Sequence, residues 1–277
     1  DRAELNVDAL IGAAKDINDD ISFDAAVGAN LRKNRFESVG VSGSPFILPY
    51  LYSFNNVTNI GRSYGFAETQ VNSAYYTADF TYRNFLTLGT TGRYDAYSTL
   101  PEGNNTAFVP SVTTSFIFSE LYKPSFLSYG KVRASYATTS NEFTNPYQTR
   151  VYYSLGNTYN GLPVGSFPTS LPSGLLKPFT TSELEFGLDL KFFGNRLGVD
   201  LAYFDKKTKN EIMPASYSIA TGYTSGFVPS GSVQNKGLEL QVTGSPLKKK
   251  SFSWNVTMNM TSVQNKVLKT GPTNGRL

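Results

Sequence analysis

The chain has 277 residues, of which 40% are hydrophobic and 17% are charged, and it contains no His and no Cys. Soluble globular chains usually carry roughly 25% charged residues, so the charge is low. Without His and Cys there is no Ser-His-Asp or Cys-His catalysis, no disulfide framework and no zinc site of the usual kind. We therefore expect no enzyme, no catalytic residue, no metal and no cofactor. The net charge of +4 is small and its basic residues are scattered, so nucleic acid is not an expected partner.

No stretch approaches the roughly 18 consecutive apolar residues that a membrane-spanning helix requires, and the longest short apolar run is 9–14. The first residues, starting Asp1-Arg2-Ala3, lack the basic start and the apolar core of a signal peptide. We expect the chain to be mature, cytoplasmic or cut from something longer, and we do not expect a helical membrane protein.

Alternation of apolar and polar residues with a period of two predicts about ten strands and no helix. In chain order the expected strands cover residues 4–15, 23–31, 76–82, 86–94, 109–120, 130–140, 184–192, 196–206, 238–242 and 252–260. The clearest are 184–192 and 252–260, where every even position is apolar and the odd positions are mostly polar. Each such segment reads as a strand with one apolar side and one polar side.

The connections between these strands alternate in length. Short ones are expected at 17–20, 83–84, 123–129, 194–195 and 245–249, and long ones at 33–63, 98–107, 141–179 and 212–231. Strand, tight turn, strand and long loop is the layout of an antiparallel up-and-down meander with elaborated loops at one end.

Alternation alone does not distinguish a membrane barrel from a soluble β-sandwich. Three features favour the barrel: a mixed charged and polar face, as expected for a wet lumen, strands that exceed ten residues, and long loops on one side only. Aromatic residues near the ends of the apolar segments resemble interfacial girdles. These residues are Tyr94, Tyr203, Phe192, Phe252 and Trp254.

If the short turns are periplasmic, both ends of the chain lie outside the cell, whereas complete barrels have both ends in the periplasm. Residues 269–277 read as the start of an outer loop. An open ten-stranded meander would also leave two unpaired edges in lipid. We expect residues 1–277 to be part of one transmembrane β-barrel domain, an internal piece of a larger barrel.

Two sets of residues have both a functional and a structural interpretation. Glu183, Glu185, Asp189 and Asp200 could serve acid/base chemistry, or they could form a hydrated lumen wall balanced by Lys191 and Lys206. Aromatic side chains in the outer loops could stack on sugar rings or grip peptide side chains, or could simply pack the loops together. The candidates for ligand binding are Tyr50, Tyr52, Tyr152, Tyr153, Tyr217 and Tyr223.

The residues 182–189, 192–197 and 200–204 together resemble the late-barrel hairpin of SusC/RagA-type TonB-dependent transporters of Bacteroidetes. Residues 231–240 resemble the "G-x-V-x-N-K-G-x-E" strand of that family, and 94–98 resemble its "R-x-D-x-S" strand end. The match covers much of 64–264.

The resemblance implies a multi-pass barrel of about 22 strands in the bacterial outer membrane. It further implies an N-terminal plug, a SusD-like surface lipoprotein, and the TonB complex acting through segments that this chain lacks. Compared with the family pattern, we expect the plug, the signal peptide and the terminal strand to be absent from 1–277. Glycans or oligopeptides would be the substrates, and outer-membrane lipid the surroundings. An adhesin or structural β-protein without transport remains the alternative, while outer-membrane protease and phospholipase barrels need a His that this chain lacks.

Overall fold

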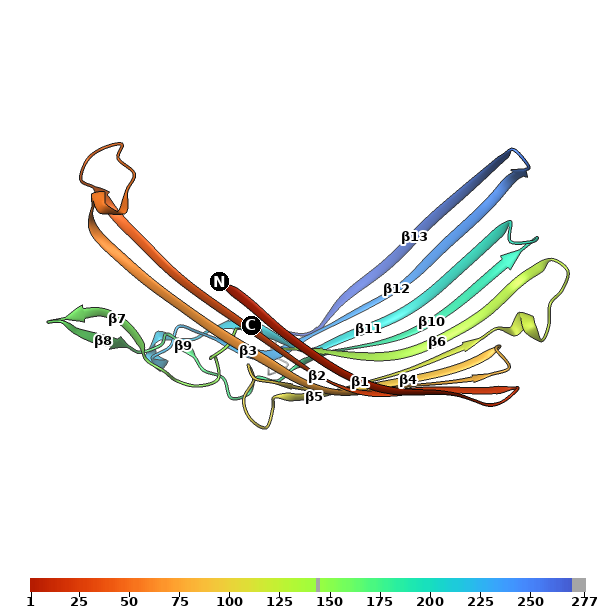
Figure 1. The fold of residues 1–277 in the computed structure, drawn as a ribbon, viewed down its shortest axis with the longest axis horizontal. Coiled ribbons are helices and arrows are strands. Elements are labelled where there is room, and N and C mark those ends of the chain that lie inside the picture. Colours follow the sequence, from red (N-terminus) through yellow and green to blue (C-terminus); the bar gives the residue numbers. More distant parts are fainter. Residues whose placement is uncertain (143–144, 271–277) are drawn as a thin grey trace.

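The computed structural model describes residues 1–142 and 145–270, with residues 156–158 described without their side chains. Most of the expected outer loop at 269–277 therefore lies outside the described residues. Ten long strands follow one another in one antiparallel sheet (Figure 1). They are β1 (Arg2–Asn18), β2 (Ile21–Phe46), β3 (Val57–Tyr82), β4 (Leu86–Tyr97), β5 (Thr106–Phe116), β6 (Leu127–Asn141), β10 (Phe179–Phe192), β11 (Leu197–Ser216), β12 (Ser225–Lys249) and β13 (Phe252–Lys269).

The remaining elements are short. β7 (Ser154–Tyr159) and β8 (Leu162–Ser166) form a separate hairpin, and β9 (Ser170–Leu171) pairs with β12 in parallel. Single turns of 3-10 helix are η1 (Phe54–Asn56), η2 (Phe118–Glu120) and η3 (Ile219–Thr221). Within the described ranges, no helix has the length and apolar character needed to cross a membrane.

The ends of the sheet differ as the spacing of the strands predicts. Tight turns join β1 to β2, β3 to β4, β10 to β11 and β12 to β13 at one end, and the β2–β3, β4–β5, β6–β10 and β11–β12 connections gather at the opposite end (Figure 1). The β5–β6 connection also lies at the tight-turn end, but it covers 117–126 and includes η2, so the short turn expected at 123–129 is wrong. The antiparallel meander is confirmed, and the longest connection, between β6 and β10, lies at the expected end. In the described part of the chain β1 and β13 do not pair with each other, so the sheet is open.

Cross-strand partners point to the same side of a sheet, so the register assigns each side chain to a face. One face, called the apolar face below, carries a nearly continuous band of hydrophobic residues across the strands. One row of it runs through Phe23, Phe80, Leu88, Thr114, Ala134, Phe186, Tyr203, Leu238 and Ser262. The opposite, polar face carries Asp24, Asp79 and Glu185 in the adjacent row.

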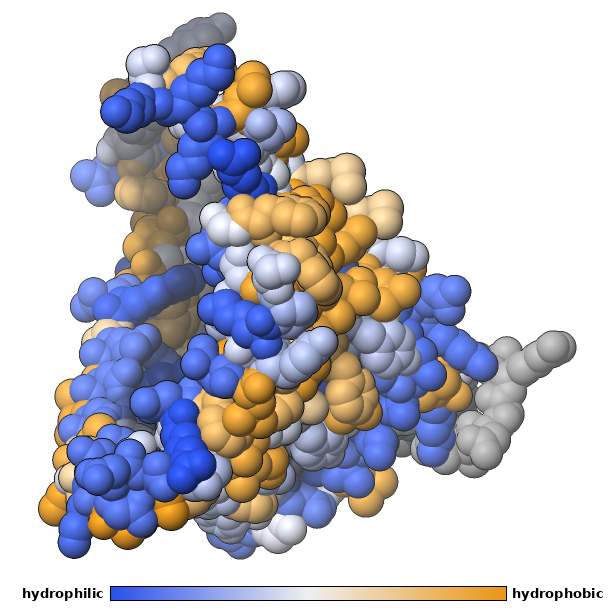
Figure 2. Space-filling view, turned by 90° about the vertical axis from the view of Figure 1, so that its right-hand side faces the viewer, coloured by the Kyte–Doolittle hydropathy of each residue, from blue (hydrophilic) through white to orange (hydrophobic). Residues whose placement is uncertain are grey.

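Nothing in the described residues covers the apolar face. Phe186 is 51% exposed and Met258 is 53% exposed although both lie mid-strand. Figure 2 shows a cluster of hydrophobic side chains on the surface, bordered by hydrophilic ones. A sheet whose apolar side chains point outward is built to meet a lipid core.

Several boundaries expected from the sequence are wrong. Residues 33–46 and 57–63 belong to β2 and β3, so the first long loop is only 47–56. Likewise β11 and β12 extend into the expected 212–231 loop, and β12 continues to Lys249 through the expected turn at 245–249. Beyond the apolar band both faces meet water, so the period of two fades while the backbone ladder continues.

Candidate ligand-binding surface

The polar face is braced by a long side chain that crosses one strand to reach the next. Arg133 on β6 donates through Nη1 and Nη2 to the two carboxylate oxygens of Asp200 on β11, at 3.2 and 3.1 Å, and through Nε to Glu185 at 3.2 Å. Gly187 on β10 lies between, and a Cβ there would overlap the Arg133 guanidinium. The glycine therefore leaves the path that the arginine needs.

The same arrangement recurs at the other side of the sheet. Tyr75 on β3 reaches across β2, and its hydroxyl donates to Asp8 on β1 at 2.8 Å. Gly28 on β2 pairs with Tyr75, and a Cβ at Gly28 would collide with the tyrosine ring. Two glycines thus let polar side chains tie together strands that are not neighbours.

The carboxylates singled out from the sequence do share the polar face, and cations neutralise them. Glu183 lies 3.8 Å from Lys206, and Asp189 lies 3.9 Å from Lys131. Glu185 and Asp200 share Arg133, which sequence reasoning did not identify. Lys191 instead lies over the ring of Tyr129. These ion pairs favour the interpretation of the carboxylates as part of a hydrated lumen wall over a role in acid/base chemistry.

A second network lies closer to the loops, around a buried carboxylate. Asp95 is 6% exposed and accepts hydrogen bonds from Arg93 Nε at 2.7 Å and from the Ser73 hydroxyl at 2.5 Å. The Tyr97 hydroxyl lies 3.3 Å from the other Asp95 oxygen and 2.7 Å from the Ser140 hydroxyl. A buried charge with this many partners is firmly held.

Glu142 fastens the start of the long β6–β10 loop to the polar face. Its carboxylate accepts from Arg32 Nη2 on β2 at 3.2 Å and from the Thr99 hydroxyl at 3.2 Å. Burial raises the pKa of Glu142, against the opposing effects of Thr99 and Arg32. The contact joins residues 110 positions apart and lies outside the apolar band.

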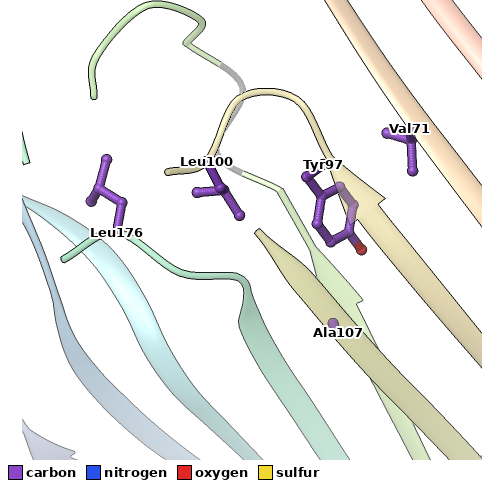
Figure 3. Close-up of a cluster of buried hydrophobic side chains, with 5 residues drawn as sticks. All are labelled: Val71, Tyr97, Leu100, Ala107 and Leu176. Carbon is purple, nitrogen blue, oxygen red and sulfur yellow. The ribbon is translucent and has the colours of Figure 1, made fainter. Parts of the chain in front are cut away.

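An apolar cluster holds the far part of the same loop. Leu176 is fully buried and packs with Leu100, Tyr97, Val71 and Ala107 (Figure 3). One polar contact reinforces it, because Asn104 Nδ2 in the 98–105 connection donates to the carbonyl of Gly174. Within the loop, the amide of Ser173 donates to the carbonyl of Gln148. The loop is therefore packed against the mouth of the sheet at several points.

An open cavity of about 590 Å³ lies at the loop end, and Leu100 and Tyr97 of the apolar cluster form part of its lining. Tyr147 and Tyr152 line it together with Arg150 and Glu102. The two tyrosine rings meet edge to face with centroids 6.5 Å apart, and the Tyr147 hydroxyl accepts from the amide of Glu68. Tyr97 borders this cavity and a second one, of about 570 Å³, on the polar face. The 590 Å³ cavity is therefore lined by tyrosine rings, one basic side chain and one acidic side chain.

The six predicted ligand tyrosines do not form one site. Tyr50 and Tyr52 stand on the 47–56 loop, 90% and 81% exposed, and Figure 1 shows that loop well apart from β7 and β8. Asn56 shapes the loop, because its side chain accepts from the Leu48 amide and donates to the carbonyl oxygens of Leu48 and Leu51.

The other four lie on two loops that meet. Phe167 contacts Tyr153 on one side and Tyr223 on the other, with ring centroids 5.9 and 5.5 Å apart. Tyr217 lies beside Gly226 at the start of β12. Among the six, only Tyr152 lines the 590 Å³ cavity.

Sequence reasoning did not single out the charged residues of this surface. Arg150 and Glu102 lie in segments without periodicity, so no signal distinguished them from other loop residues. For Arg133 a weak signal existed, because Gly187 interrupts an otherwise bulky strand and an isolated strand glycine indicates close approach of another group.

Residues 5–276 match the family model described as TonB dependent receptor-like, beta-barrel. Over 228 residues the chain is 27% identical to a TonB-dependent receptor of Formosa agariphila, covering 79% of this chain and 23% of that protein. It is 26% identical over 191 residues to the TonB-dependent receptor SusC of Bacteroides thetaiotaomicron, covering 65% and 19%. The chain spans about a quarter of the length of the curated relatives it matches.

Solved structures show the same fold. The RagAB peptide importer in its closed-closed state superposes with a TM-score of 0.83 at 19% identity, covering 97% of this chain and 31% of that one. The siderophore receptor PirA of Pseudomonas aeruginosa gives 0.59 at 17% identity, covering 97% and 44%. The resemblance to SusC/RagA-type proteins is thereby confirmed. This chain belongs to the family of TonB-dependent receptor β-barrels, which lie in the bacterial outer membrane.

Proposed function

We propose that this chain forms part of the barrel wall and the extracellular loops of a transporter that imports glycans or oligopeptides. The apolar face meets lipid and the polar face lines the lumen. The transporter is driven by the TonB complex and works with a SusD-like surface lipoprotein. The open edges at β1 and β13 support a larger barrel, because unpaired backbone groups in lipid cost several kcal/mol each. The number of about 22 strands comes from the resemblance to the family.

The cavity at the loop end is the observation that carries this proposal. Its tyrosine rings offer faces for a sugar ring or an apolar peptide side chain, and Arg150 and Glu102 offer charges of opposite sign. The Glu142 and Leu176 anchors hold this surface against the sheet, so it is formed before cargo arrives. Preorganisation of this kind lowers the entropic cost of binding.

Binding to the full-length receptor tests the proposal. The probe is a peptide or oligosaccharide that the unaltered receptor has retained from a mixture. We expect Tyr152→Ala to weaken the affinity for this probe about tenfold, because the change removes one aromatic wall of the cavity. Tyr159→Ala is the matched control, since Tyr159 is 73% exposed on β7 and does not line the cavity. Equal loss in both variants would show that the cavity is not the binding surface.

Growth distinguishes the two substrate classes. A strain that lacks the full-length gene should lose growth on either peptides or oligosaccharides as sole nutrient, and the intact gene should restore it. Normal growth and uptake on both classes, together with lost attachment to surfaces, would instead support the adhesin alternative.

A further inference from the structure

Three neighbouring strands place lysines on the apolar face, directly beyond its hydrophobic band on the loop side. The band on β11, β12 and β13 consists of the rows Val199–Val242–Met258, Leu201–Leu240–Met260 and Tyr203–Leu238–Ser262. Toward the loops the next rows are Asp205–Lys236–Gln264, Lys207–Gln234–Lys266 and Lys209–Ser232–Lys269. The lysine patch defined here consists of Lys207, Lys209, Lys236, Lys266 and Lys269.

The patch carries a large excess of positive charge. Its one carboxylate, Asp205, lies 3.4 Å from Lys236 Nζ and 3.7 Å from Lys207 Nζ, and it also accepts from Gln234 at 2.7 Å. Within the described ranges no carboxylate pairs with Lys209, Lys266 or Lys269. Asp205 therefore pairs with two of the five lysines, and the other three have no carboxylate partner among the described residues.

On the opposite side of the sheet, at a comparable distance beyond the band, the basic side chains have acidic partners. On β2 and β3, Lys33 pairs with Glu68 at 2.8 Å and Arg35 pairs with Glu37 at 2.9 Å, both on the apolar face. Those cations are neutralised within the chain. An unbalanced patch confined to β11–β13 is therefore not a general property of the strand ends.

The patch lies where a lipid head group would lie, and it is large enough to cover one. Rows two residues apart are separated by about 7 Å and outer strands by about 10 Å. Such an area spans one phosphate-bearing head group whose acyl chains would run down along Tyr203, Leu238 and Met260. Lysine is a common phosphate ligand and acts as a point charge on a flexible stem.

We propose that the lysine patch binds the phosphate groups of anionic lipids in the outer leaflet and so fixes this side of the barrel wall in the membrane. Juxtamembrane lysines attract anionic lipid in this way. The assignment to the outer leaflet uses the orientation in which the long loops are extracellular. It does not depend on which cargo is imported.

Native mass spectrometry of the full-length, delipidated receptor tests this, with phosphatidylglycerol as the probe and diacylglycerol of the same acyl chains as the uncharged comparison. The variant Lys207→Gln/Lys209→Gln/Lys266→Gln should bind phosphatidylglycerol at least about tenfold more weakly and diacylglycerol unchanged. Unchanged affinity for phosphatidylglycerol would overturn the proposal.

The matched control is Lys33→Gln/Arg35→Gln/Arg62→Gln, which removes three cations from the same face of β2 and β3. It should retain phosphatidylglycerol, and an equal loss there would refute a specific patch. Inorganic phosphate that displaces the lipid at equal concentration would mean that the site takes a free anion. If the patch variant does not fold, the unaltered receptor decides: equal affinity for both lipids contradicts the proposal, and a salt-sensitive preference for phosphatidylglycerol supports it.

Discussion

Replacing Leu176 by alanine should release the long β6–β10 loop from the sheet. Leu176 is 0% exposed, whereas its neighbours Leu100, Tyr97 and Val71 are 4–5% exposed. Leucine-to-alanine changes in well-packed cores cost about 2–5 kcal/mol. This cluster is small, so the site can partly collapse and we expect about 2–3 kcal/mol. The free energy of loop opening falls by that amount, which corresponds to roughly 30- to 150-fold more frequent opening.

Hydrogen exchange in the full-length receptor measures this opening. The amide of Thr224 donates to the carbonyl of Thr169 in the β6–β10 loop and so reports on loop docking, whereas the amide of Ser173 donates to the carbonyl of Gln148 within the loop and reports on its internal order. Leu175→Ala is the control, because its neighbour Leu175 is 75% exposed. If Leu176→Ala speeds exchange at these amides no more than Leu175→Ala does, the cluster does not hold the loop and the reasoning fails.

Three further changes probe the other anchors. Docking of the loop raises the pKa of Glu142. Glu142 therefore stabilises docking fully at a pH below the ordinary carboxyl pKa, and this stabilisation is lost as the pH rises through the raised pKa. Mobility of a label at Leu155 should therefore increase with pH, and Glu142→Gln should abolish that dependence. Gly187→Ala should displace the Arg133 side chain that crosses it and lower the free energy of unfolding by about 1–3 kcal/mol, measured as a lower urea midpoint. An unchanged midpoint would contradict this. Asn56→Ala should increase proteolysis of the 47–56 loop, whereas Asn55→Ala should not.

Local sequence predicted the strands that cross the apolar band, because there one side must be apolar and the other polar. The segment 184–192 has both its period and its neighbours as expected, and Asp200 lies on the same face as Asp189. Where both faces meet water, as along 33–46, no period remains, and pairing with β3 decides that the segment is a strand.

The sequence by itself determined the fold class, the two faces and the end of the sheet that carries the loops, since alternation and turn residues act over a few positions. Only the tertiary structure decided which distant residues meet. Arg133 finds Asp200 across Gly187, Leu176 fills a gap beside Leu100, and five lysines on three strands become one patch. Each of these depends on cross-strand register and loop docking, which are set by contacts between segments far apart in the chain.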